Sequence, residues 1–167
     1  NKPTVYAQVF FVNYLKAFSL NFLFAEGDIN FRHHIHEMGE FYYFELILLL
    51  IGLWYLFFKV EKEKKLLVLG LLIVAPIPGS LTSDGGYHGT RLILMLPPLI
   101  ILNALGFYYL FTIRKKLLGK TVISTILVLF IFNLVFYLHR YYVHYPIESW
   151  RWWHYGYKEA MLYMKSV

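Results

Sequence analysis

The chain has 167 residues, of which 59% are hydrophobic, 20% aromatic and only 16% charged, and its net charge is +6. A soluble domain carries about 25% charged residues, and a chain this short cannot bury so much apolar surface in one core, so the composition favours a membrane protein. The basic residues lie between apolar runs rather than along one stripe, which excludes a nucleic-acid-binding surface. Cysteine is absent, so the chain forms no disulfides and no thiolate metal site.

The first apolar segment, 4–24, predicts a helix that lies in the membrane interface. Its polar residues Gln8, Asn13, Lys16 and Ser19 fall within one arc of a helical wheel, which is typical of a helix on the bilayer surface. The alternative is a spanning helix whose polar residues face neighbouring helices.

The next segment, 25–40, is a polar loop with a candidate metal site. His33, His36 and Glu37 have the i, i+3, i+4 spacing that places three ligand-type side chains on one face of a helix, and His88 would complete the shell. We therefore consider a divalent metal here. Solvated or hydrogen-bonded histidines are the alternative interpretation.

Four apolar segments predict membrane-spanning helices, so the expected fold class is an all-α polytopic bundle that covers 1–138. Each approaches the length of about 20 residues that crosses a bilayer. Pro76 and Pro78 predict that the second span unwinds before the surface, and the pair Pro97 and Pro98 predicts a kink near the start of the third. The predicted spans are 41–58, 66–81, 92–113 and 121–138.

The tail, 139–167, is predicted to be an aromatic surface segment that leads into a truncated outer domain. Trp and Tyr are enriched where a protein meets the headgroups of a membrane. The last residues predict the beginning of a helix. The Trp and Tyr residues on which this prediction depends are Tyr141, Tyr142, Tyr145, Trp150, Trp152, Trp153, Tyr155 and Tyr157.

Basic residues in short loops predict the orientation. The loops 59–65 and 114–120 each carry four Lys or Arg residues, whereas the loop 82–91 has Arg91 alone. Because basic loops stay in the cytoplasm, we expect a multi-pass protein of the cytoplasmic membrane. The loops 25–40 and 82–91 and the tail would then lie outside the cytoplasm, and so would any chemistry.

The central loop gathers Asp84, His88 and Arg91 within eight residues. A guanidinium binds phosphate through two parallel hydrogen bonds, so Arg91 is a candidate for anion binding, and His88 would share the anion. Asp84 would orient one of these two side chains or cap the turn. The alternative for Arg91 is that it only reaches toward the lipid headgroups.

Glu45 lies about one turn inside the first predicted span. A carboxylate is costly inside a bilayer without a partner, so we expect it to pair with Arg32, Arg91 or a histidine.

Two stretches, GDINFRHHIHEMGEFYYFEL and PIPGSLTSDGGYHGTRLILMLPPLIILNALG, carry a resemblance to a known family. They resemble the C-terminal membrane half of bacterial and archaeal glycosyltransferases of the polytopic GT-C class, similar to the dolichyl-phosphate-mannose protein mannosyltransferases. The resemblance covers most of 10–113. Many members have a proline where Gly86 stands, and Asp84, His88 and Arg91 are the residues that match directly.

The resemblance implies a membrane enzyme of protein glycosylation type that passes a sugar from a polyprenyl-phosphate donor to a protein, lipid or glycan. In this class the catalytic carboxylate lies in an outer loop near the N-terminus, so no catalytic residue is expected in this chain, which would be inactive alone. Arg91 and Arg32 would balance the donor phosphate and His88 would hydrogen-bond it. Glu45 or Asp28 would hold these cations in place.

Two other classes remain as alternatives. A transporter or lipid flippase would line its path with the breaks at 76–78 and 97–98, although such sites lie near the bilayer midplane and these breaks lie near the outer surface. A non-catalytic membrane subunit would use its outer loops to bind a partner.

Overall fold

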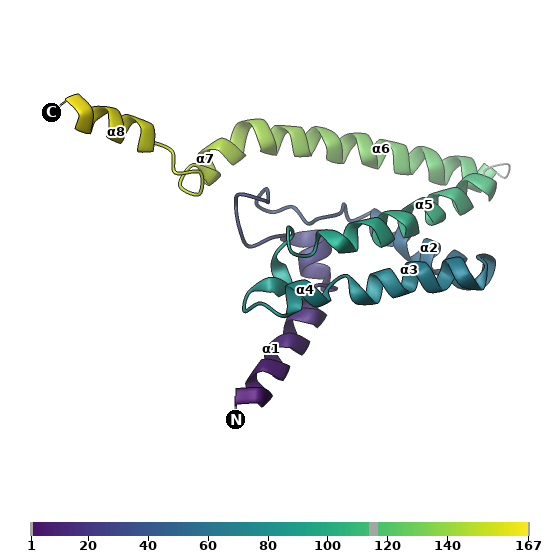
Figure 1. The fold of residues 1–167 in the computed structure, drawn as a ribbon. Coiled ribbons are helices and arrows are strands. Elements are labelled where there is room, and N and C mark those ends of the chain that lie inside the picture. The colour runs from purple at the N-terminus through teal and green to yellow at the C-terminus, as the bar shows by residue number, and fades with distance from the viewer. Residues whose placement is uncertain (1, 114–116, 167) are drawn as a thin grey trace.

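The computed structural model describes residues 2–113 and 117–166, and in these ranges the chain forms helices and loops without any strand. The predicted all-α class is confirmed. In Figure 1, α3, α5 and α6 run alongside one another, whereas α1 runs across their direction and projects away from them. The principal helices are α1 (Lys2–Lys16), α2 (Glu45–Lys59), α3 (Lys62–Val74), α5 (Leu96–Ile113) and α6 (Leu117–His139).

Close packing of α2 along α5 forms the centre of the bundle. Gly52 and Gly106 bring the two backbones together, because a Cβ at Gly52 would overlap the carbonyl oxygen of Leu102. Small residues of this kind let helices approach closely in membrane bundles. Each helix buries one stripe spaced by three or four residues, namely Leu48, Leu49, Gly52 and Leu56 in α2, and Leu99, Leu102, Gly106 and Leu110 in α5.

Two helical stretches within the described residues, Ile93–Ile113 and Gly119–Ser149, are long and apolar enough to cross a membrane. They correspond to the third and fourth predicted spans. The other two predicted spans correspond to α2, with 15 residues, and α3, with 13 residues. At about 1.5 Å per residue these two helices are shorter than the hydrocarbon core of a bilayer.

The predicted helix over 4–24 is divided in the structure. After α1, an irregular turn leads to a π-helical turn, Asn21–Ala25, whose start is fixed by the Ser19 hydroxyl accepting the N–H of Phe22 at 3.2 Å. Asn13 is buried and donates its side-chain amide to the carbonyl of Thr82 at 2.5 Å. At Asn13 the polar arc therefore faces the central loop, not the water that an interfacial helix would meet.

The predicted span over 66–81 begins and ends earlier than expected. Lys62 already belongs to α3, because Lys and Glu are good helix formers. The helix ends at Val74 and a short α4, Ile77–Ser80, follows Pro76. Proline cannot donate to the helical hydrogen-bond ladder, so the predicted unwinding is confirmed.

Pro97 and Pro98 do not kink a helix. A short 3-10 turn, Ile93–Met95, precedes them, and both prolines lie in the first turn of α5. The first N–H groups of a helix need no partner, so proline begins a helix without cost there. The predicted kink was wrong because the helix starts at Leu96.

The C-terminal part continues as helix beyond the predicted span of 121–138. A π-helical turn follows α6, and then come α7 (Tyr145–Ser149) and α8 (Tyr157–Ser166). The helix predicted at the end of the tail is confirmed as α8, which stands apart from the bundle in Figure 1. Three basic residues of the predicted cytoplasmic loop 114–120 lie outside the described residues, namely Arg114, Lys115 and Lys116.

The polar loops gather at one end of the bundle. The turn between α2 and α3, the end of α5 and the start of α6 lie together at the opposite end (Figure 1). The loop 25–40, the central loop 82–91 and α7 therefore share one face, as the sequence predicts.

Candidate functional site

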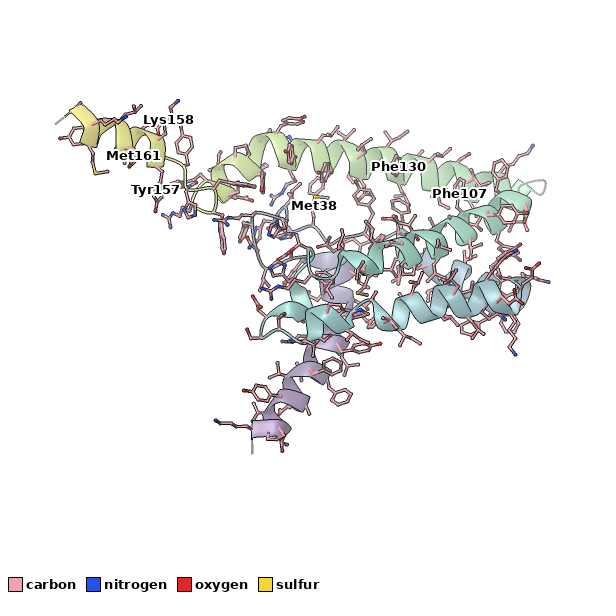
Figure 2. All side chains as sticks on the ribbon, in the orientation of Figure 1. Met38, Phe107, Phe130, Tyr157, Lys158 and Met161 are labelled. Atoms are coloured by element: carbon pink, nitrogen blue, oxygen red, sulfur yellow. The ribbon has the colours of Figure 1, made fainter. Side chains whose placement is uncertain are left out.

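A cavity of about 500 Å³ lies between the loop 25–40 and the C-terminal end of α6. The loop supplies a polar wall that contains Arg32, His33, His34 and Glu40. The opposite wall is aromatic. It consists of Tyr137, Tyr141, Tyr145 and Trp153. Met38, labelled in Figure 2 beneath α6, also lines this space.

Asp28 joins the two outer loops. Its carboxylate is buried and accepts the N–H of Asn30 and the N–H of Gly89, both at 2.7 Å. The Nδ1 atom of His88 lies 3.5 Å from the same carboxylate. A carboxylate that accepts several N–H groups stabilises the loops that supply them. Asp28 therefore fixes the position of His88 rather than that of an arginine.

Glu40 lies beside Asp28 and borders the cavity. Burial among protein atoms and the charge of Asp28 raise the pKa of Glu40 to about 7, although the backbone N–H of Asp28 opposes this effect. A Cβ at Gly89 would lie 3.1 Å from a carboxylate oxygen of Glu40 and 3.3 Å from one of Asp28, so glycine makes room for both acids. On the same wall, burial lowers the pKa of His34.

Arg91 is occupied by its own loop. Its guanidinium donates to Asp84 and, at 2.9 Å, to the hydroxyl of Thr82. The hydrogen bond from Arg91 lowers the pKa of Asp84. Of the two predicted roles for Asp84, the structure has the ion pair with Arg91, and the Asp84 side chain makes no capping hydrogen bond to the 3-10 turn Gly85–Tyr87 that follows it. Arg91 does not line the cavity.

Arg32 lines the cavity and also holds the tail. Its Nε atom donates to the carbonyl of Trp152 at 2.5 Å, and its Nη2 atom lies 2.9 Å from Nε2 of His154. The three residues predicted to share one phosphate are therefore placed differently. Arg32 faces the tail, His88 faces Asp28, and Arg91 faces Asp84.

Among the described residues, no cation lies within ion-pair distance of Glu45. Its carboxylate accepts the N–H of Tyr42 at 2.7 Å and the side-chain amide of Asn103 at 3.2 Å. The predicted partners were Arg32, Arg91 or a histidine, and that prediction was wrong. Neutral N–H donors from the neighbouring turn and from α5 satisfy the acid instead.

The predicted metal ligands do not form a helical face. The segment 31–37 folds as turns, and Glu37 adopts a left-handed backbone with φ of 63°. The carboxylate of Glu37 instead lies 3.4 Å from Arg140. Among the described residues, no three His or acidic side chains are arranged to hold a metal ion. The i, i+3, i+4 interpretation of His33, His36 and Glu37 was wrong because it required a helix.

An apolar groove extends from the cavity along α2, α5 and α6. It consists of two adjoining hollows of about 350 and 210 Å³, which share Phe44, Leu48 and Ile126. Phe41 and Glu45 line both the larger hollow and the polar cavity. The site is therefore a polar chamber at the loop end of the bundle with an apolar groove leading into it.

No family model, curated protein or solved structure matches the chain. Function is therefore inferred from the residues and from the shape of the site.

The aromatic wall and Glu40 are the parts of the site that the sequence did not predict. Tyr137, Tyr141 and Tyr145 recur every four residues, a helical spacing that predicts one shared face. This spacing was visible in the sequence, but the last predicted span ended at 138 and so separated Tyr137 from the other two tyrosines. Glu40 carried no signal, because only the fold brings it beside Asp28.

Proposed function

We propose that the chain is part of an integral membrane glycosyltransferase that transfers a sugar from a polyprenyl-phosphate donor to an acceptor outside the cytoplasm. The observation that carries the proposal is the junction of the polar chamber with the apolar groove at Phe41 and Glu45. A lipid-linked sugar has the same two parts, a long apolar tail and a polar head. The acceptor is a protein, lipid or glycan that reaches the chamber from outside.

The polyprenyl tail would lie in the groove between α2, α5 and α6. The groove is lined almost entirely by aliphatic and aromatic side chains, and binding an apolar chain there removes apolar surface from its surroundings. The side of α6 that faces lipid would then border the path by which the donor arrives.

The donor phosphate would meet Arg32 at the wall of the chamber. The guanidinium of Arg32 makes its two contacts through Nε and Nη2. Its Nη1 atom has no hydrogen-bond partner among the described residues, so it is free to donate to a phosphate. Arg91 and His88 are engaged by Asp84 and Asp28, and would reach the phosphate only by exchanging those partners. The catalytic carboxylate would come from a loop outside this chain.

We propose that α2, α3 with α4, α5 and α6 all span the cytoplasmic membrane. The residues 41–44 before α2, and 75–81 with α4 after α3, are largely apolar. They would extend these two short helices to the thickness of the membrane. The loop 59–65 would face the cytoplasm, and α1 would lie across the bundle near the outer surface, as its direction in Figure 1 supports.

Transfer assays with variants of neighbouring residues test this proposal. Ile100 lines the groove, whereas Ile101 on the same helix does not, and both side chains are exposed. The full-length protein would be assayed with polyprenyl-phosphate mannose and glucose of long and short chain length. We expect Ile100→Trp to reduce transfer from the long-chain donors at least tenfold and to affect short-chain donors less. Ile101→Trp should behave as wild type.

Equal effects of the two tryptophan variants would contradict a tail site in the groove. A protein that moves the lipid-linked sugar across vesicles without forming any glycosylated product would be a flippase, and the proposed function would be wrong.

A further inference from the structure

We infer that the three tyrosines of the aromatic wall hold the pyranose ring of the transferred sugar, an assignment that rests on the proposed function. Tyr137, Tyr141 and Tyr145 form a continuous stack, here called the tyrosine ladder. The ring centroids of Tyr137 and Tyr141 are 6.0 Å apart with planes 15° apart, and those of Tyr141 and Tyr145 are 5.6 Å apart with planes 10° apart.

The ladder is held at its outer end by the tail and the polar loop. The Tyr145 hydroxyl accepts the indole N–H of Trp153 at 3.0 Å and donates to the carbonyl of Arg32 at 3.4 Å. Trp153 and Tyr145 both line the cavity. The ladder is therefore an ordered platform that extends from α6 to the start of α7 along one wall of the chamber.

The chemistry of the two walls matches a sugar ring. A pyranose has an apolar face of C–H groups, whose hydrogens are complementary to the negative face of an aromatic ring. Its hydroxyls are donors and acceptors that require polar partners when they leave water. Arg32, His34 and Glu40 supply donors and acceptors on the opposite wall. A chamber of about 500 Å³ is of the size that accommodates a small ligand such as a hexose.

A belt of tyrosines at the headgroups would be an alternative explanation of the same residues. Tyr142 and Tyr155, which are 72% and 75% exposed, do not line the chamber and fit such a belt. The ladder differs because all three of its members border the chamber. In addition, Tyr137 and Tyr145 both stack on Tyr141. The ladder tyrosines therefore differ from Tyr142 and Tyr155 in that they face the polar wall across the chamber.

The test is saturation-transfer NMR on the full-length protein in a detergent without a sugar headgroup. The probes are methyl α-D-mannopyranoside and methyl β-D-glucopyranoside, and mannitol is the acyclic control with hydroxyls but no ring face. We expect signals from at least one pyranoside and none from mannitol. Tyr141→Ala should weaken pyranoside binding roughly fivefold, as expected for the loss of one aromatic contact. Tyr141→Phe should retain binding.

Tyr155→Ala is the matched control, because Tyr155 is exposed on the tail and does not line the chamber. Tyr137→Ala provides a second variant of the ladder if Tyr141→Ala does not fold. The inference is overturned if the ladder variants bind pyranosides as wild type does, if mannitol gives equal signals, or if Tyr155→Ala causes the same loss. Pyranoside binding that depends on the ladder in a protein without transfer activity would overturn the proposed function alone.

Discussion

Gly52 in α2 and Gly106 in α5 lie where each helix meets the backbone of the other. A Cβ on Gly52 would overlap the carbonyl oxygen of Leu102, and a Cβ on Gly106 would overlap the carbonyl oxygen of Leu48. The two helices therefore touch along their main chains, and side chains added at either glycine must separate them. This contact supports the side of the groove that α2 and α5 form.

We predict that Gly52→Ala destabilises the protein by about 1–3 kcal/mol, because overpacking forces the backbones apart. Gly70→Ala is the control, since Gly70 lies in α3 with no atom near its would-be Cβ. That substitution should be neutral or stabilising by about 1 kcal/mol, as alanine is the better helix former. Thermal unfolding in detergent would measure both. A Gly52→Ala variant as stable as Gly70→Ala would refute close packing of α2 on α5.

Removing the carboxylate of Asp28 should release the central loop from the loop 25–40. Asp28→Ala leaves the N–H groups of Asn30 and Gly89 without their acceptor, which costs about 1–3 kcal/mol for each group that stays buried. Hydrogen exchange at 85–90 would measure the release. Asp84→Ala is the comparison, because its pair with Arg91 is exposed and worth at most about 1 kcal/mol. If the amide hydrogens of 85–90 exchange as slowly in Asp28→Ala as in wild type, Asp28 does not join the two loops.

Glu40 predicts a pH dependence of stability. Because the pKa of Glu40 is raised from 4.5 to about 7, the folded protein binds more protons than the unfolded chain between these values. The free energy of unfolding should therefore fall as the pH rises from 4.5 to 7 and stay level above it. The Glu40→Gln variant lacks this loss, so it should exceed wild type in stability at pH 8 and match it at pH 4.

The lowered pKa of His34 acts in the opposite direction, since stability is lost as the pH falls through the titration of this histidine. Both proteins share that effect, so the difference between wild type and Glu40→Gln isolates the carboxyl. An equal difference at pH 4 and pH 8 would show that Glu40 is not perturbed.

Arg140 connects the end of α6 to the loop 25–40. The side chain is largely buried, donates to the carbonyl of His36 at 2.9 Å and lies 3.7 Å from Glu148. Arg140→Met leaves these acceptors unpaired, so we expect a loss of about 1–3 kcal/mol and faster proteolysis of the loop 25–40. Arg151→Met is the control, because Arg151 is exposed on the tail. Equal proteolysis of the two variants would contradict the connection.

The all-α class and the approximate positions of the helices could be predicted, because long apolar runs with few charges have few other solutions. Helix ends were less accessible. Pro97 and Pro98 read as a kink when a helix was assumed before them, and as an N-terminus once the helix begins at Leu96. Local sequence does not distinguish a kinked helix from a helix that begins at the prolines. The answer depends on whether the residues before the prolines form part of the same helix.

The site was harder to predict than the fold. Arg32, His33 and Glu45 do line the cavity, but Arg91, His88 and Asp84 do not. The partner of Arg91 lies seven residues away, whereas the wall opposite Arg32 lies more than a hundred residues along the chain. Spacing within one loop predicts local ion pairs well. It carries no information on which distant helix covers that loop.

The contact of Asn13 with Thr82 has a consequence for biosynthesis. The two residues are 69 positions apart, and the π-helical turn Asn21–Ala25 and the helices α2, α3 and α4 are synthesised between them. During translation α1 therefore emerges long before the carbonyl groups that will accept its buried amide. The helix reaches its final position only after α2, α3 and α4 have been synthesised. The docking of α1 against the central loop is thus a late step, and it reports that α2, α3 and α4 are in place.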